Sequence, residues 1–132
     1  MRTVLQTAHP QEKAAGARRA WSDWRRGNLS CVFDQPHDWP DRPARPARPE
    51  LLHPREMPAR RLGSETGRAA QIHALAHIEL NAIDLACDMA GRFTDHDLPK
   101  EFFSDWLSIA ADEARHFMML AKRLNDLGFA YG

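Results

Sequence analysis

Two stretches of apolar residues that repeat every three or four positions constrain the fold of this 132-residue chain more than any other feature. This spacing places apolar side chains along one face of an α-helix and predicts that each helix packs against a partner. Ser64 can cap the start of the first helix, and Gly128 can end the second. The apolar positions are Ile72, Ala76, Ile83, Ala86, Ala90 and Phe93 in the first stretch, and Phe103, Trp106, Ala110, Phe117, Leu120, Leu124 and Leu127 in the second.

A short connection from Thr94 to Pro99 separates the two predicted helices. Two long helices joined by so few residues pack against each other in opposite directions. We therefore predict an all-α protein in which residues 63–132 form a long antiparallel helix hairpin.

The residues before the hairpin divide into a short helix and a proline-rich segment. Pro10 to Arg26 is rich in alanine and carries Trp21 and Trp24 on one face, so we expect a helix whose indoles pack on an apolar surface. Seven prolines between positions 36 and 58 exclude an α-helix or a central strand there. Residues 1–62 are thus predicted to pack on the hairpin as a short helix and an extended Pro/Arg-rich strap.

The proline-rich segment contains an arginine every third residue, in Arg42-Pro43, Arg45-Pro46 and Arg48-Pro49. This is the period of a polyproline II helix, which would align the arginines along one edge. Contact with phosphate or RNA is one interpretation. A stiff strap with solvated arginines is favoured, because such segments commonly act as spacers.

Charge and composition limit the classes of partner that the protein is expected to bind. The 18 basic and 18 acidic residues balance, which gives no support for nucleic-acid binding but leaves tRNA open. The chain has neither an apolar secretory signal nor a membrane-spanning run, so we expect a cytoplasmic protein without membrane association. Cys31 and Cys87 lack metal or redox spacing and are expected to be free, mostly buried thiols.

Each apolar stripe is interrupted once by a glutamate, at Glu79 and at Glu113. An ionised carboxylate on an apolar face is costly to bury unless it is paired or binds a metal. Antiparallel packing can bring both glutamates to the same height along the hairpin. His116 lies one helical turn after Glu113. Glu79, Glu113 and His116 are therefore predicted metal ligands, suited to iron or manganese.

A structural ion pair is the alternative explanation for these glutamates. Either could pair with His116, Arg115 or Arg92 instead of with a metal. Asp112 and Asp84 could orient the imidazole of a metal ligand, or they could be solvated.

A second histidine pair, His73 and His77, is spaced by one helical turn on a polar stripe away from Glu79. It lacks the glutamate that zinc proteases carry directly after the first histidine of this spacing. We expect surface or inter-subunit hydrogen bonds there. The other members of this stripe are Asn81, Asp84 and Asp88.

Several motifs resemble one known family. They are His77-Ile-Glu-Leu-Asn-Ala-Ile-Asp-Leu-Ala86, Ala111-Asp-Glu-Ala-Arg-His-Phe117, the Leu127-Gly-Phe-Ala-Tyr-Gly132 end and the upstream Arg-Pro repeats. With these motifs the chain resembles the amino-terminal half of the bacterial ferritin-like family filed as domain of unknown function 455. More distantly it is similar to the di-iron tRNA hydroxylases.

The resemblance implies a four-helix ferritin-like bundle with a dinuclear iron site. In it Glu79 would be the first glutamate, and Glu113 with His116 the first Glu-x-x-His. Family members continue into a second helix pair that carries the other glutamate and the other Glu-x-x-His. A di-iron bundle of this kind uses two of each, and this chain has one of each.

Two functions are therefore expected. The first is a di-iron oxidoreductase with an unknown small-molecule substrate, in which a second copy of the chain or a separate half-bundle chain completes the site. The second is a truncated, metal-free helical interaction module. Phosphate loops and nucleophile elbows are absent from the sequence, so phosphoryl transfer and serine-type hydrolysis have no support.

Overall fold

The computed structural model describes residues 1–30, 39–56 and 63–132. Within these ranges all regular structure is helical, which confirms the prediction of an all-α chain for this part. No described helix combines the length and apolar content needed to cross a bilayer. The elements are α1 (Arg2–Leu5), α2 (Pro10–Arg25), the 3-10 turn η1 (Pro54–Glu56), α3 (Glu65–Arg92) and α4 (Lys100–Asp126).

The helices begin and end where the sequence signals lie. Pro10 occupies the first turn of α2, where its missing N–H is not needed. The Ser64 hydroxyl caps α3 by accepting a hydrogen bond from the Gly67 N–H at 3.0 Å. Gly128 follows α4 with a φ of +79°, a left-handed conformation that glycine adopts without strain. The four-residue α1 was not predicted.

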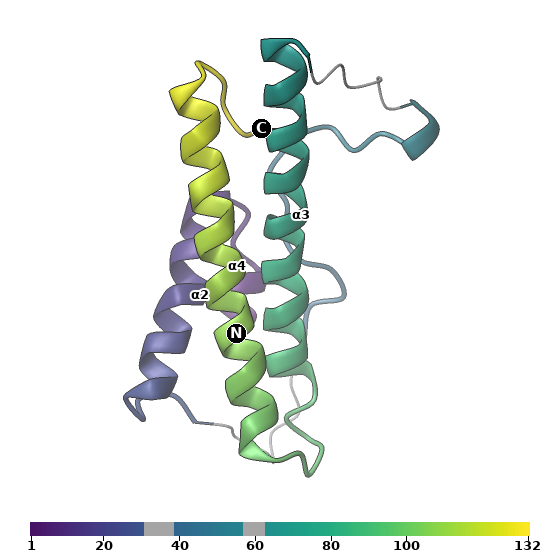
Figure 1. Ribbon diagram of the computed structural model, residues 1–132. Coiled ribbons are helices and arrows are strands. Elements are labelled where there is room, and N and C mark those ends of the chain that lie inside the picture. The colour runs from purple at the N-terminus through teal and green to yellow at the C-terminus, as the bar shows by residue number, and fades with distance from the viewer. Residues whose placement is uncertain (31–38, 57–62) are drawn as a thin grey trace.

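The two long helices, α3 and α4, run antiparallel side by side (Figure 1). Their apolar stripes face one core, and α1 and α2 close that core from one side of the hairpin. Fully buried alanines allow these helices to approach closely. The core comprises Val4, Leu5, Ala14, Ala17, Ala76, Leu80, Ile83, Ala86, Cys87, Ala110, Ala114, Phe117 and Ala121.

Helix α2 packs mainly on α4. The Trp24 indole N–H donates a 2.8 Å hydrogen bond to the Ser104 hydroxyl, and Lys100 lies over the same ring. Trp24 thus contacts α4 through a hydroxyl and an ammonium group, where packing on an apolar surface was expected. Trp21 instead carries Arg25 over its ring, with 5.9 Å between the guanidinium carbon and the ring centroid.

Residues 39–53 have no regular secondary structure and contact α3. The Trp39 indole N–H donates to Asp88 at 2.5 Å, and Arg92 donates to the Pro40 carbonyl at 3.1 Å. Arg45 donates to Asn81 and lies 3.4 Å from a carboxylate oxygen of Asp84. The expectation of solvated arginines is therefore wrong for Arg45, because a buried carboxylate attracts it. The rest of the predicted strap, residues 31–38 and 57–62, lies outside the described residues.

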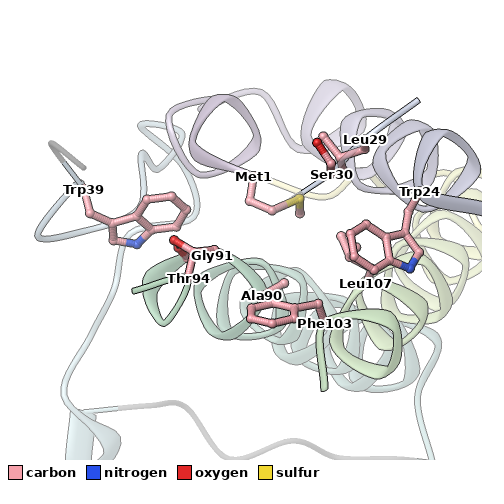
Figure 2. A pocket seen from close by; sticks show the side chains of 10 residues that line it. All are labelled: Met1, Trp24, Leu29, Ser30, Trp39, Ala90, Gly91, Thr94, Phe103 and Leu107. Atoms are coloured by element: carbon pink, nitrogen blue, oxygen red, sulfur yellow. The ribbon is translucent and has the colours of Figure 1, made fainter. Parts of the chain in front are cut away.

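A pocket of about 170 Å³ lies at the end of the hairpin where α3 stops and α4 starts (Figure 2). Its walls include Trp24 and Trp39, which face each other across it, and Ala90. Trp39 packs directly on Gly91, where an added Cβ would lie 2.0 Å from the indole. Ala90 lies eleven residues after Glu79, which is about 16 Å along the axis of α3. The pocket is therefore distinct from the predicted metal ligands.

A buried ion pair joins α2 to α3. The Lys13 side chain is 1% exposed and donates to Asp84, which is 5% exposed, and to the Ala44 carbonyl at 3.0 Å. Burial raises the pKa of Asp84, and the hydrogen bond from Lys13 opposes that rise. Sequence analysis placed Asp84 on a polar stripe of the helix, and the structure corrects this by showing that the side chain is buried. The stripe is covered by α2 and residues 39–53, which come from elsewhere in the chain.

The C-terminal Tyr131 lies against the other polar residues of α3. Its hydroxyl is 2.8 Å from His77 Nδ1, and its ring stacks on His73 with centroids 4.9 Å apart. The Gly132 N–H donates to His73 Nε2 at 3.3 Å. The two histidines therefore make contacts within the chain, where surface or inter-subunit contacts were expected.

Replacing Lys13 by methionine should lower the free energy of unfolding by about 3–5 kcal/mol, because it leaves the buried Asp84 carboxylate without its main partner. Urea denaturation followed by circular dichroism measures this loss. Lys122→Met is the matched control: Lys122 is 75% exposed, so loss of its pair with Asp126 should cost less than about 1 kcal/mol. Adding Asp84→Asn to Lys13→Met should recover most of the loss. A change below about 1 kcal/mol for Lys13→Met would contradict this account.

The phenol of Tyr131 should titrate later than an exposed tyrosine. Burial, the main cause, raises its pKa from 10.0 to about 12. The neutral form is favoured in the folded state, so the stability that it contributes is full below pH 10 and is lost as the pH rises toward 12. Tyr131 is the single tyrosine of the chain, so tyrosinate absorbance follows it alone. A midpoint near 10 while circular dichroism still shows native helix would refute the burial of this side chain.

Candidate metal centre

The structure brings together the three predicted ligands, Glu79 from α3 and Glu113 and His116 from α4. One candidate ligand atom from each side chain lies within 4.8 Å of the other two. The Nδ1 atom of His116 is 3.2 Å from Glu113 Oε2 and 3.6 Å from Glu79 Oε2. The approach follows from antiparallel packing, which places the middle of α3 beside the middle of α4. Their role as metal ligands stays a prediction.

Glu79 and Glu113 are partly exposed, although burial within the apolar stripe was expected for both. Glu79 and Glu113 are each 24% exposed, and His116 is 42% exposed. The difference arises because α1 and α2 cover only one side of the hairpin. The ligand set therefore sits on the other side, accessible to solvent in the single chain.

The two glutamates lie close enough for each to shift the pKa of the other. Their mutual hydrogen bond is the main cause that raises the pKa of Glu79 and lowers the pKa of Glu113, with burial of Glu79 adding to its rise. His116 lies close enough for its positive form to favour both carboxylates in the ionised state. Two carboxylates this close repel each other when both are ionised, and a bound cation would relieve that repulsion.

Of the three alternative ion-pair partners, Arg92 and Arg115 are engaged elsewhere, whereas His116 lies beside both glutamates as that alternative also expects. Arg92 pairs with Asp88 at 2.8 Å, and Arg115 lies 3.4 Å from Asp112. Of the two aspartates considered as supports for the imidazole, Asp84 belongs to the ion pair with Lys13. Asp112 is 61% exposed. Arg115 Nη2 instead lies 3.4 Å from the outward nitrogen of His116.

The histidines and cysteines outside this set offer no further described metal cluster. His73 and His77 contact Tyr131, as described above. Cys87 is a free, buried thiol as predicted, and burial raises its pKa to about 12, which makes it a poor ligand or nucleophile. Cys31 lies outside the described residues. Within residues 1–30, 39–56 and 63–132, Glu79, Glu113 and His116 form the one group of this kind.

Exposed apolar side chains that the sequence analysis did not name lie on the same two helices as the ligands. Three of them fall at helical spacing from the ligands, Leu75 and Ile109 four residues before Glu79 and Glu113 and Met119 three after His116, so part of the signal was present in the sequence. We call this set the open face. Its residues are Leu75, Ile78 and Leu85 of α3, which are 39%, 59% and 58% exposed, and Ile109 and Met119 of α4, which are 39% and 60% exposed.

Comparison with known proteins identifies the family of the chain. A family described as "Protein of unknown function (DUF455)" matches residues 6–132. An uncharacterized protein of Haemophilus influenzae is 36% identical to this chain over an alignment of 138 residues. The alignment covers 98% of this chain and 48% of that protein. The chain thus spans about half the length of this curated relative. No solved structure matches it with significance. The chain therefore belongs to the DUF455 family of proteins of unknown function.

Proposed function

We propose that this chain is one half of a ferritin-like di-iron carboxylate protein, in which Glu79, Glu113 and His116 bind metal once a second helix pair covers the open face. One observation carries the proposal. Two carboxylates and an imidazole, brought from two helices, place their ligand atoms within 4.8 Å of one another. Isolated Glu-x-x-His pairs occur by chance on helices, but a third ligand at the same level on the neighbouring helix is not expected from chance alone.

The chemistry of the ligands supports iron, with manganese as the alternative. Carboxylate oxygens and imidazole nitrogen suit divalent iron and manganese, whereas a sulfur-rich set would favour zinc or copper(I). The repulsion within the carboxylate pair supplies a reason for a cation to bind. The Arg115 guanidinium lies 3.4 Å from His116 Nε2, the ring nitrogen other than the one beside the glutamates.

The number of ligands supports a half-site. Di-iron bundles use two glutamates and two Glu-x-x-His motifs, and the hairpin carries one of each. The Haemophilus relative has about as many further residues as this chain matches, which is enough for a second helix pair. Residues 1–62 would then brace the outer side of the half-bundle.

The proposed activity is oxidation of a small molecule. Iron bound at such a site supplies redox chemistry with dioxygen. The residues of this chain would hold the metal through the two carboxylates and the imidazole. The open face, once covered, would exclude bulk water from the site.

A metal-free interaction module is the second candidate function, and the open face favours it. Five large apolar side chains exposed on one side of a hairpin are typical of a surface that binds another protein. Metal content separates the two functions, because the module requires none.

Glu113→Gln should abolish metal binding, because it keeps the side-chain volume but removes the charge that binds the cation. In the absence of metal, the free energy of unfolding of the variant should equal or slightly exceed that of the parent, because repulsion with Glu79 is reduced. Plasma mass spectrometry of protein purified from iron-supplied cells measures the metal. Glu101→Gln, an exposed position on the same helix, is the matched control and should retain parental metal content.

Two results would count against the proposal. The first is a parent protein that carries no metal after purification and binds no added iron(II) under anaerobic conditions. The second is a Glu113→Gln variant that loses its helical structure while the parent is indifferent to metal, which would indicate a structural ion pair.

A further inference from the structure

We propose that the pocket where α3 stops and α4 starts binds a small, uncharged, apolar molecule of about the size of one aromatic ring. This site is separate from the predicted metal ligands, and the proposal stands whether or not they bind metal. It follows from the size of the pocket and from the chemistry of its walls.

Small residues of α3 leave the space for the pocket. Ala90 and Gly91 carry only a methyl group and a hydrogen atom where the pocket meets this helix. The walls that α4 contributes, Phe103 and Leu107, are 1% and 2% exposed. Buried side chains on packed helices are held in fixed rotamers, so this part of the pocket is rigid. The pocket is therefore formed before any ligand arrives.

The volume suits one aromatic ring. A cavity of about 150 Å³ lined by aliphatic and aromatic side chains is known to hold benzene, and this pocket measures about 170 Å³. Trp24 and Trp39 offer ring surfaces on opposite sides of it (Figure 2). Offset or edge-to-face contacts between aromatic rings stabilise a complex beyond the effect of burial. Met1 adds a flexible, polarisable thioether that adapts to a neighbouring ring.

The walls offer a ligand few polar partners. The indole N–H groups of Trp24 and Trp39 donate to side chains outside the pocket, at 2.8 and 2.5 Å. The Thr94 hydroxyl donates to a backbone carbonyl of α3 at 3.3 Å. Ser30 is the remaining polar side chain among the described walls, and it is exposed. An apolar molecule is therefore favoured over one that needs hydrogen bonds.

The ligand is also expected to be uncharged. None of the side chains described as lining the pocket is ionisable. A charged molecule would lose hydration there without gaining a counter-charge, which is unfavourable.

A ligand in this pocket would join three parts of the chain. Trp24 belongs to α2, Trp39 precedes the hairpin in sequence, and Ala90 and Phe103 belong to the two helices of the hairpin. Unfolding separates these walls, so the ligand binds the folded chain alone. By mass action it should raise the temperature of unfolding in proportion to its occupancy.

The experiment follows the indole N–H signals of the four tryptophans by nitrogen-15 NMR while fluorobenzene is added. Each signal is assigned by replacing that tryptophan with phenylalanine. Trp24 and Trp39 line the pocket, whereas Trp21 and Trp106 are not among its described walls and serve as internal controls. We expect the signals of Trp24 and Trp39 to shift and to saturate together. Their common dissociation constant should be about 1 mM, within the affinity range of a ligand of this size.

Ala90→Leu should weaken the binding of fluorobenzene at least about tenfold, because the larger side chain occupies the pocket. Ala70→Leu is the matched control: Ala70 is exposed on the same helix, about 30 Å away along the axis, and this variant should bind like the parent. Circular dichroism verifies that the helices remain. If leucine disrupts the fold, Ala90→Val, with a smaller addition at the same position, should fold and weaken binding in the same direction.

Three results would overturn the site. Equal shifts of all four indole signals would mean that fluorobenzene binds the surface at large. Shifts that stay linear up to the solubility limit of fluorobenzene would mean that no site of this kind exists. Parental affinity in folded Ala90→Leu or Ala90→Val would place the ligand elsewhere.

Discussion

The buried ion pair between Lys13 and Asp84 determines which side of the hairpin is covered. It fastens α2 to α3, and the same lysine donates to the carbonyl of Ala44, so three separate parts of the chain meet at one ammonium group. A buried charge without its partner is strongly unfavourable, which holds these segments on that side of α3. The opposite side is left to Glu79, Glu113 and His116.

The candidate site follows from that one-sided burial. Two glutamates lie close together among exposed apolar side chains, beside a histidine that is 42% exposed. Each feature alone has an ordinary structural explanation. Together they describe carboxylates that a cation would stabilise and apolar neighbours that another helix pair would stabilise. The metal site and the docking surface are therefore parts of one surface.

The hairpin, its caps and the three candidate ligands could be predicted from sequence, because they depend on local signals and on one short connection. The sequence could not show which side the distant segments cover, and so Asp84 was placed on a polar stripe and Arg45 was expected to be solvated. A signal for Lys13 was available: with Pro10, Ala14 and Ala17 it forms the buried stripe of α2, and it interrupts that stripe as Glu79 interrupts its own. A charged residue that interrupts the apolar stripe of one helix is thus a candidate partner for a charged residue of another helix.

X-ray absorption at the iron edge of the iron-loaded protein tests the central claim most directly. If Glu79, Glu113 and His116 hold a dinuclear site, the spectrum should show oxygen and nitrogen ligands, an imidazole contribution and a second iron as a heavy neighbour. A spectrum of isolated iron with water ligands and no imidazole contribution would contradict the account.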